Sequence, residues 1–126
     1  MLRLAAIFSA IILVFDVLWA LLAKAVSINW GTSLILSAVL YVAMGVYAGV
    51  RLGIWQRATI AIAIAALVDW TLGWFIAWSI GPGFVFNSPS PVELLAGVIF
   101  GTLYGTAFGA VGAFFGCRAA KMGSPQ

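Results

Sequence analysis

The sequence predicts an all-α fold: a polytopic membrane protein with four transmembrane helices in a bundle. Of its 126 residues, 65% are hydrophobic and only 7% are charged, whereas soluble domains carry about 25% charged residues. A chain with so little charge cannot cover a globule with polar surface. Uncharged apolar runs long enough to cross a bilayer recur at about residues 4–23, 32–50, 58–80 and 91–117. We therefore expect residues 1–126 to form a single four-span transmembrane domain.

The first two spans form the first half of the chain. Residues 4–23 lie between Arg3 and Lys24. Because Asp16 interrupts this apolar run, it does not have the core of an ordinary signal peptide, and we expect an uncleaved span. Residues 32–50 follow and end beside Arg51.

The second half contains a longer loop and a longer final helix. Residues 58–80 carry Asp69 near their middle, and Gly81-Pro82-Gly83 then predicts the end of the helix. The last helix begins with Ser90-Pro91-Val92-Glu93. Serine at the N-cap with glutamate three residues later is a capping box, and this motif gives Glu93 a structural role.

Glycines repeat every three or four residues in the second and fourth spans. Each glycine inside a water-soluble helix costs about 1 kcal/mol relative to alanine, so a stripe of them favours close packing of helices in a bilayer. A lining of exposed backbone along a narrow pathway is the alternative. The predicted packing positions, a glycine zipper, are Gly45, Gly49, Gly53, Gly97, Gly101, Gly105, Gly109, Gly112 and Gly116.

The two halves resemble each other. Each has an aspartate-bearing helix followed by a glycine-striped helix that ends in Gly-x-Arg, as in Gly49-Val50-Arg51 and Gly116-Cys117-Arg118. A duplication of two-helix hairpins would relate the halves by a pseudo-two-fold axis along the membrane normal. The alternative is that any two apolar hairpins look this similar.

Asp16 and Asp69 are the only ionisable side chains well inside the predicted spans. A charge at the bilayer centre costs about 2.5–3.5 kcal/mol on insertion scales, so such residues face the protein interior. Together with Trp70 and Gly73 they form a candidate site for an ion, a proton or a substrate. The alternative is that each buried carboxyl group only makes structural hydrogen bonds between helices.

Several classes of function are excluded by composition. The chain has no histidine and one cysteine, Cys117, which excludes His-ligated haem and catalytic triads that contain histidine. No nucleotide-binding fingerprint is present. We therefore expect no enzyme activity, no metal site and no cofactor. We also expect no nucleic-acid partner, because the basic residues stand singly at helix ends.

Basic residues predict the orientation. With the N-terminus inside, five of the six basic residues are cytoplasmic and only Lys24 is external. This asymmetry favours two cytoplasmic termini, in a plasma membrane or a bacterial inner membrane. The five are Arg3, Arg51, Arg57, Arg118 and Lys121.

Two functions remain open. The leading hypothesis is a small integral membrane protein that serves as a structural or accessory subunit of a membrane assembly. The alternative is a small oligomeric transporter or channel that uses Asp16 and Asp69 for proton or cation coupling. In both cases the lipid bilayer is a partner. We also expect a homo-oligomer or a larger membrane complex, because a monomer of this size has little interior.

Overall fold

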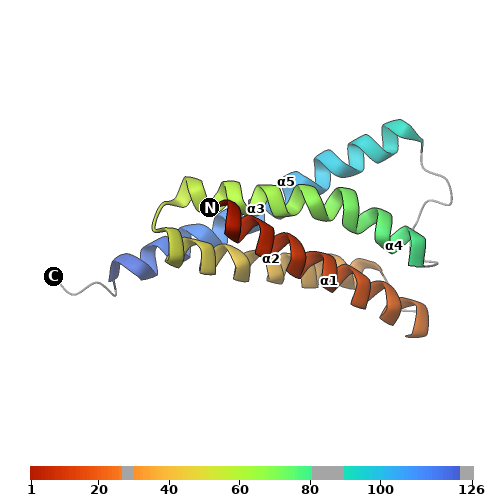
Figure 1. The fold of residues 1–126 in the computed structure, drawn as a ribbon, viewed down its shortest axis with the longest axis horizontal. Helices are drawn as coiled ribbons and strands as arrows, with labels where there is room; N and C mark the ends of the chain where they lie inside the picture. Colours follow the sequence, from red (N-terminus) through yellow and green to blue (C-terminus); the bar gives the residue numbers. More distant parts are fainter. Residues whose placement is uncertain (27–29, 81–89, 123–126) are drawn as a thin grey trace.

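The fold is a bundle of long helices that run roughly side by side (Figure 1). It was obtained as a computed structural model, which describes residues 1–26, 30–80 and 90–122. The predicted helix stop at Gly81-Pro82-Gly83 lies outside these residues. The described residues contain no strand, and their elements are α1 (Leu2–Val26), α2 (Trp30–Leu52), α3 (Trp55–Val68), the π-helical turn η1 (Asp69–Gly73), α4 (Trp74–Ile80) and α5 (Pro91–Met122).

Four segments are long and apolar enough to cross a membrane, so the predicted all-α, four-span fold is confirmed. The third span is continuous from Trp55 to Ile80 and comprises α3, η1 and α4. The helices extend beyond several predicted ends: α5, for example, reaches Met122 rather than ending near residue 117. The prediction placed the ends at the first charged residues, but Arg and Lys side chains can remain on a helix and extend toward water.

The most extensive contact between helices joins α2 and α5. At Gly49 the two backbones are so close that a Cβ atom would lie 2.8 Å from the amide nitrogen of Cys117. At Gly45 a Cβ atom would lie 2.9 Å from the amide nitrogen of Ala113. From the opposite side, Cβ atoms on Gly112 and Gly116 would overlap backbone atoms of α2. Glycine therefore allows backbone to pack on backbone over this half of the pair.

The other glycines of α5 make room for large side chains. Such contacts bring bulky side chains close to the helix axis, which a Cβ atom on the glycine would prevent. Trp74 lies over Gly97, Trp70 over Gly101, Tyr41 over Gly105 and Ile62 over Gly109.

The prediction for Gly53 as a helix-packing residue is wrong. Gly53 lies in the turn between α2 and α3, with φ of +64°, and an added Cβ atom would have no neighbour within 4 Å. It continues the four-residue spacing of Gly45 and Gly49, but the helix ends at Leu52. Its role is conformational, because L-residues with a side chain adopt a positive φ at an energetic cost.

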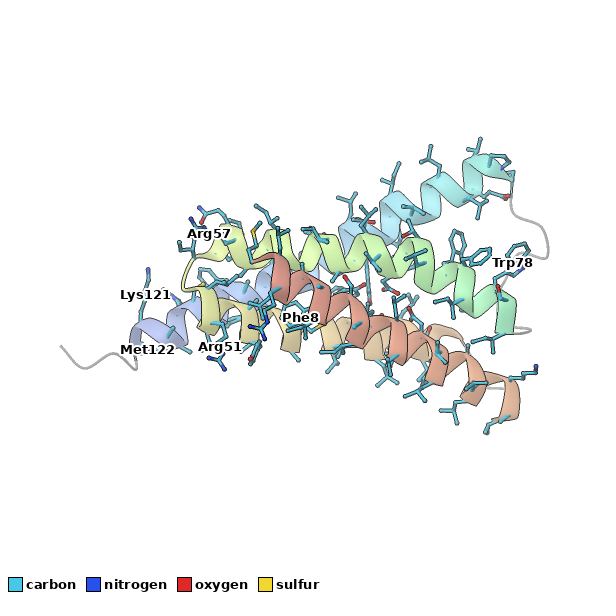
Figure 2. All side chains as sticks on the ribbon, viewed as in Figure 1. Phe8, Arg51, Arg57, Trp78, Lys121 and Met122 are labelled. Atoms are coloured by element: carbon cyan, nitrogen blue, oxygen red, sulfur yellow. The ribbon has the colours of Figure 1, made fainter. Side chains whose placement is uncertain are left out.

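Contacts at the helix ends fix the lengths of the spans. The predicted capping box is confirmed: the Ser90 amide donates to Glu93 Oε2 at 2.7 Å, and the Glu93 amide donates to Ser90 Oγ at 3.3 Å. Lys24 Nζ donates to the Ile80 carbonyl oxygen at 3.2 Å and so joins the ends of α1 and α4. Trp78 is exposed at this end of the bundle, opposite Arg51 and Arg57 (Figure 2).

Candidate functional site

The structure brings Asp16 of α1 and Asp69 of η1 together in the interior of the bundle. Their carboxyl groups lie within hydrogen-bonding reach of each other. Asp69 is only 9% exposed, and Asp16 is partly buried. The two acidic residues, which are 53 positions apart in the sequence (69 − 16), therefore form one site rather than two separate helix contacts.

A π-helical turn positions Asp69. The turn spans Asp69–Gly73, and both of its end residues are buried. A π turn carries one residue more than an α turn and is frequent at functional sites. In the middle of the turn, the Thr71 hydroxyl donates to the Leu67 carbonyl oxygen at 2.6 Å. The extra residue changes the rotation of the third span between α3 and α4.

Gly73 provides the space for the Asp16 carboxyl group. A Cβ atom at this position would overlap Asp16 Oδ2 and would lie 3.0 Å from Asp69 Oδ1. Gly73 therefore lies directly against both acidic side chains, and any larger residue would displace at least one of them.

Tyr41 of α2 is a third member of the site. Its hydroxyl group donates a hydrogen bond to Asp69 Oδ2, and the side chain is fully buried. The prediction of site residues did not include Tyr41. The signal was its four-residue spacing from Gly45 and Gly49, which places the phenol on the buried stripe of α2.

Among the residues that the structure describes, no basic side chain lines the cavity beside the two carboxyl groups. Asp16 Oδ2 is buried and accepts no hydrogen bond from the part of the chain that the structure describes. Two adjacent carboxylates in a medium of low dielectric constant repel each other, and one shared proton removes this repulsion and supplies a hydrogen bond. The arrangement is therefore able to hold a proton or to attract a cation.

A cavity of about 110 Å³ lies beside the pair. A water molecule needs roughly 10–15 Å³ of such a cavity, so there is room for several. Its lining comes from α1, α2 and the second half of the third span: Phe15, Asp16, Trp19, Ser33, Leu34, Ser37, Asp69, Trp70, Gly73, Trp74 and Ala77.

The cavity occupies one half of the bundle. From Asp16 and Asp69, its lining continues toward the end where Lys24 meets Ile80. On the opposite side of the pair, the interior is filled by fully buried side chains, among them Ile12 and Ile62. The acidic pair thus lies at the inner end of a one-sided cavity.

Trp70 and Trp74 both line this cavity next to the acidic residues. The faces of aromatic rings attract cations, and the attraction is strongest where water is excluded. The described part of the chain offers no hydrogen-bond acceptor to the buried Trp70 Nε1. Rings and carboxyl groups that share one cavity form a surface that favours a cation over an anion.

The donor set does not match a transition-metal site. No group of three or more Cys, Asp or Glu side chains suited to a metal ion occurs in residues 1–26, 30–80 and 90–122. Two carboxyl groups and a phenol provide hard oxygen atoms only, whereas tight transition-metal sites use imidazole or thiolate ligands.

No protein family, curated protein or solved structure matches this chain.

Proposed function

We propose that this protein is a small membrane transporter or channel that binds a proton or a small cation at Asp16 and Asp69. The observation that supports the proposal is the meeting of two intramembrane carboxyl groups at the inner end of a cavity lined by aromatic rings. Ionisable residues inside membrane spans are energetically expensive and mark ion or proton pathways by default.

We further propose that both termini face the cytoplasm. Arg3, Arg51, Arg57, Arg118 and Lys121 all belong to the end of the bundle opposite Lys24, and basic residues accumulate on the cytoplasmic side. With this orientation, the cavity lies in the external half of the protein. Cations would then reach the acidic pair from outside, and the fully buried core around Ile12 and Ile62 would have to open for passage.

The test is transport in proteoliposomes. The purified protein is reconstituted in neutral phospholipid, and flux of protons, Na⁺ and methylammonium is followed after a concentration gradient is applied. Asp16→Asn and Asp69→Asn preserve the size of the side chains but remove the negative charge and replace one acceptor oxygen with an NH2 donor. We expect each variant to lose at least about 90% of the wild-type flux, a change of about 1.4 kcal/mol or more in the barrier.

Glu93→Gln is the matched control. It removes the third acidic side chain, which is exposed and makes capping contacts with Ser90. Its flux should remain within about twofold of wild type, since its change in charge lies outside the cavity. Equal flux in the wild type, both aspartate variants and empty liposomes would contradict the proposal.

A structural or accessory subunit is the second candidate. It is favoured by the Tyr41–Asp69 hydrogen bond, which gives one acidic residue an interhelical role without any ligand. In that case the wild type moves nothing, and Asp69→Asn reduces the folded yield. Both candidates are non-enzymatic.

A further inference from the structure

The end of the bundle formed by the α2–α3 turn and the last turns of α5 is strongly basic. It holds Arg51, Arg57, Arg118 and Lys121, and three of these mark that end in Figure 2. The chain has only three acidic side chains. Two of these are inside the bundle, and Glu93 lies at the opposite end of α5. No acidic side chain is therefore placed to balance the charge at this end.

A groove of about 380 Å³ lies within this basic end. One wall is the turn between α2 and α3 with the first residues of α3, and the other wall is the end of α5. The lining residues are Gly53, Ile54, Trp55, Gln56, Phe114, Cys117, Arg118 and Lys121.

Specific contacts hold the two walls together. Trp55 Nε1 donates to the Ala110 carbonyl oxygen at 3.1 Å and fixes the indole of α3 on α5. The buried Cys117 thiol lies 3.4 Å from the Gly49 carbonyl oxygen, to which it donates. The groove is therefore a built feature of the fold and not a gap between independent helices.

The electrostatics of the groove favour an anion. Arg118 lies over the Phe114 ring, 5.1 Å from its centroid, and neither Arg118 nor Lys121 makes an ion pair with a described residue. The N-cap residue of α3, Ile54, provides no side-chain cap. The amides at the start of this 14-residue helix thus add partial positive charge to that of the two cationic side chains.

The rim of the groove favours an amphiphile over a free anion. Ile54, Trp55 and Phe114 are exposed beside the cationic residues. Exposed aromatic and basic residues together at the end of a span are typical of the membrane–water interface, where apolar and polar groups meet. Basic pockets between helices at this level bind lipid headgroups.

We propose that this groove binds an anionic phospholipid, with its phosphodiester group at Arg118, Lys121 and the start of α3. The acyl chains lie along Phe114 and Ile54. This site is separate from the acidic pair and does not depend on transport. The lipid acts as a ligand that joins the α2–α3 turn to the end of α5.

The experiment measures lipid retention. Protein in neutral detergent is incubated with phosphatidylglycerol, phosphatidylcholine or inorganic phosphate, and bound ligand per protein is determined by native mass spectrometry. The wild type should retain phosphatidylglycerol at least about tenfold better than phosphatidylcholine, since charge-assisted contacts to phosphate distinguish the net charge of the two lipids. Inorganic phosphate should not displace the lipid at equal concentration.

Two double variants separate the groove from the general charge of this end. Arg118→Gln with Lys121→Gln removes two positive charges from the groove, and we expect at least about a tenfold loss of phosphatidylglycerol retention. Arg3→Gln with Arg51→Gln removes two charges outside it, and we expect less than about a threefold loss. Arg51 contacts Tyr47 and does not line the groove.

A single variant provides an independent check. Gln56→Glu places a negative charge on the groove wall while leaving every basic residue in place, so retention of phosphatidylglycerol should fall. Equal losses in the two double variants would mean diffuse surface attraction and would overturn the proposal. The proposal also fails if phosphatidylglycerol has no advantage over phosphatidylcholine, or if inorganic phosphate displaces it. The proposed transport function is measured in neutral lipid and stands or fails separately.

Discussion

The buried face of α2 has two halves with the same four-residue spacing. One half packs tightly against α5, and the other lines a cavity. Toward Leu52, Gly45 and Gly49 bring the α2 backbone against that of α5 and leave no space. Toward Trp30, Ser33 and Ser37 line a cavity. Tyr41 stands between the halves, and its hydroxyl group bonds Asp69.

The comparison shows that a helix can build a packed region and a polar cavity along one face. Glycine removes the side chain, so the neighbouring helix approaches until backbone atoms touch. Serine leaves a small polar side chain, and the bundle keeps space there. The packed half fixes the position of α5, and the glycines further along α5 then hold Trp70 and Trp74 close to the acidic pair. The packed half therefore supports the open half.

The largest expected effect comes from filling the packed half. Gly49→Leu would place a side chain against α5 backbone atoms, which cannot rotate away. Overpacking a core typically costs about 1–3 kcal/mol, and we expect at least about 3 kcal/mol at this contact between backbones. Folded yield and thermal stability in detergent provide the measurement.

The control for that variant is Gly53→Asn. A Cβ atom added to Gly53 would have no neighbour within 4 Å, so only the positive φ of this residue matters for the substitution. Asparagine tolerates this conformation, and the loss should stay at or below about 1 kcal/mol. If Gly49→Leu is no more harmful than Gly53→Asn, the close packing of α2 on α5 is not what stabilises the bundle.

A substitution beside the cavity should reduce cation flux more than it reduces the stability of the fold. Gly73→Ala puts a Cβ atom where Asp16 Oδ2 lies, but a carboxyl group can rotate. We expect about 1–3 kcal/mol of destabilisation and a loss of cation flux of at least about tenfold, because the acidic pair separates. Gly109→Ala is the control: its Cβ atom would overlap the Ile62 side chain, which can shift and does not line the cavity. Comparable flux in the two variants would argue against a function for the pair.

Tyr41→Phe tests the boundary between the halves. It removes the hydrogen bond to Asp69 without changing the volume of the ring. Loss of a buried hydrogen bond between membrane helices should cost about 1 kcal/mol, measured as thermal stability in detergent. Tyr47→Phe on the same helix is the control, since Tyr47 is exposed and its hydroxyl only accepts from Arg51 at 3.2 Å. A larger loss for Tyr47→Phe would contradict this interpretation.

The smallest effect is expected at the outer end of the open half. Lys24→Met removes the exposed hydrogen bond from Nζ to the Ile80 carbonyl oxygen. Such a contact should contribute no more than about 0.5 kcal/mol, but it joins α1 to α4. Hydrogen exchange of the last amides of α4 should become faster in this variant. Lys121→Met, at the other end of the molecule, should leave these amides unchanged.

The fold could be predicted from the sequence because hydropathy and length suffice to identify membrane spans. The positions of Asp16 and Asp69 near the middle of their spans made a common site one open hypothesis. Tyr41 was missed as its third member, because a phenol in an apolar helix is usual in a core. Gly53 was assigned wrongly, because periodicity alone does not show where a helix ends.

The π turn could not be predicted at all. Its residues, Asp69–Gly73, have no composition that distinguishes them from an α-helical segment. Gly73 in this turn lies against the Asp16 side chain of α1, a contact that appears only when the helices are assembled.

The π turn also has a consequence at the level of the gene. A π turn takes up one residue more than an α turn. A deletion of one codon within residues 70–72 would therefore restore a continuous α-helix and leave α4 close to its present orientation. The spacing of Asp69 and Gly73, which both lie against the Asp16 carboxyl group, would shrink by one residue. A reading frame one codon shorter would encode a protein that still inserts into the membrane and keeps its helix packing but has an altered acidic site.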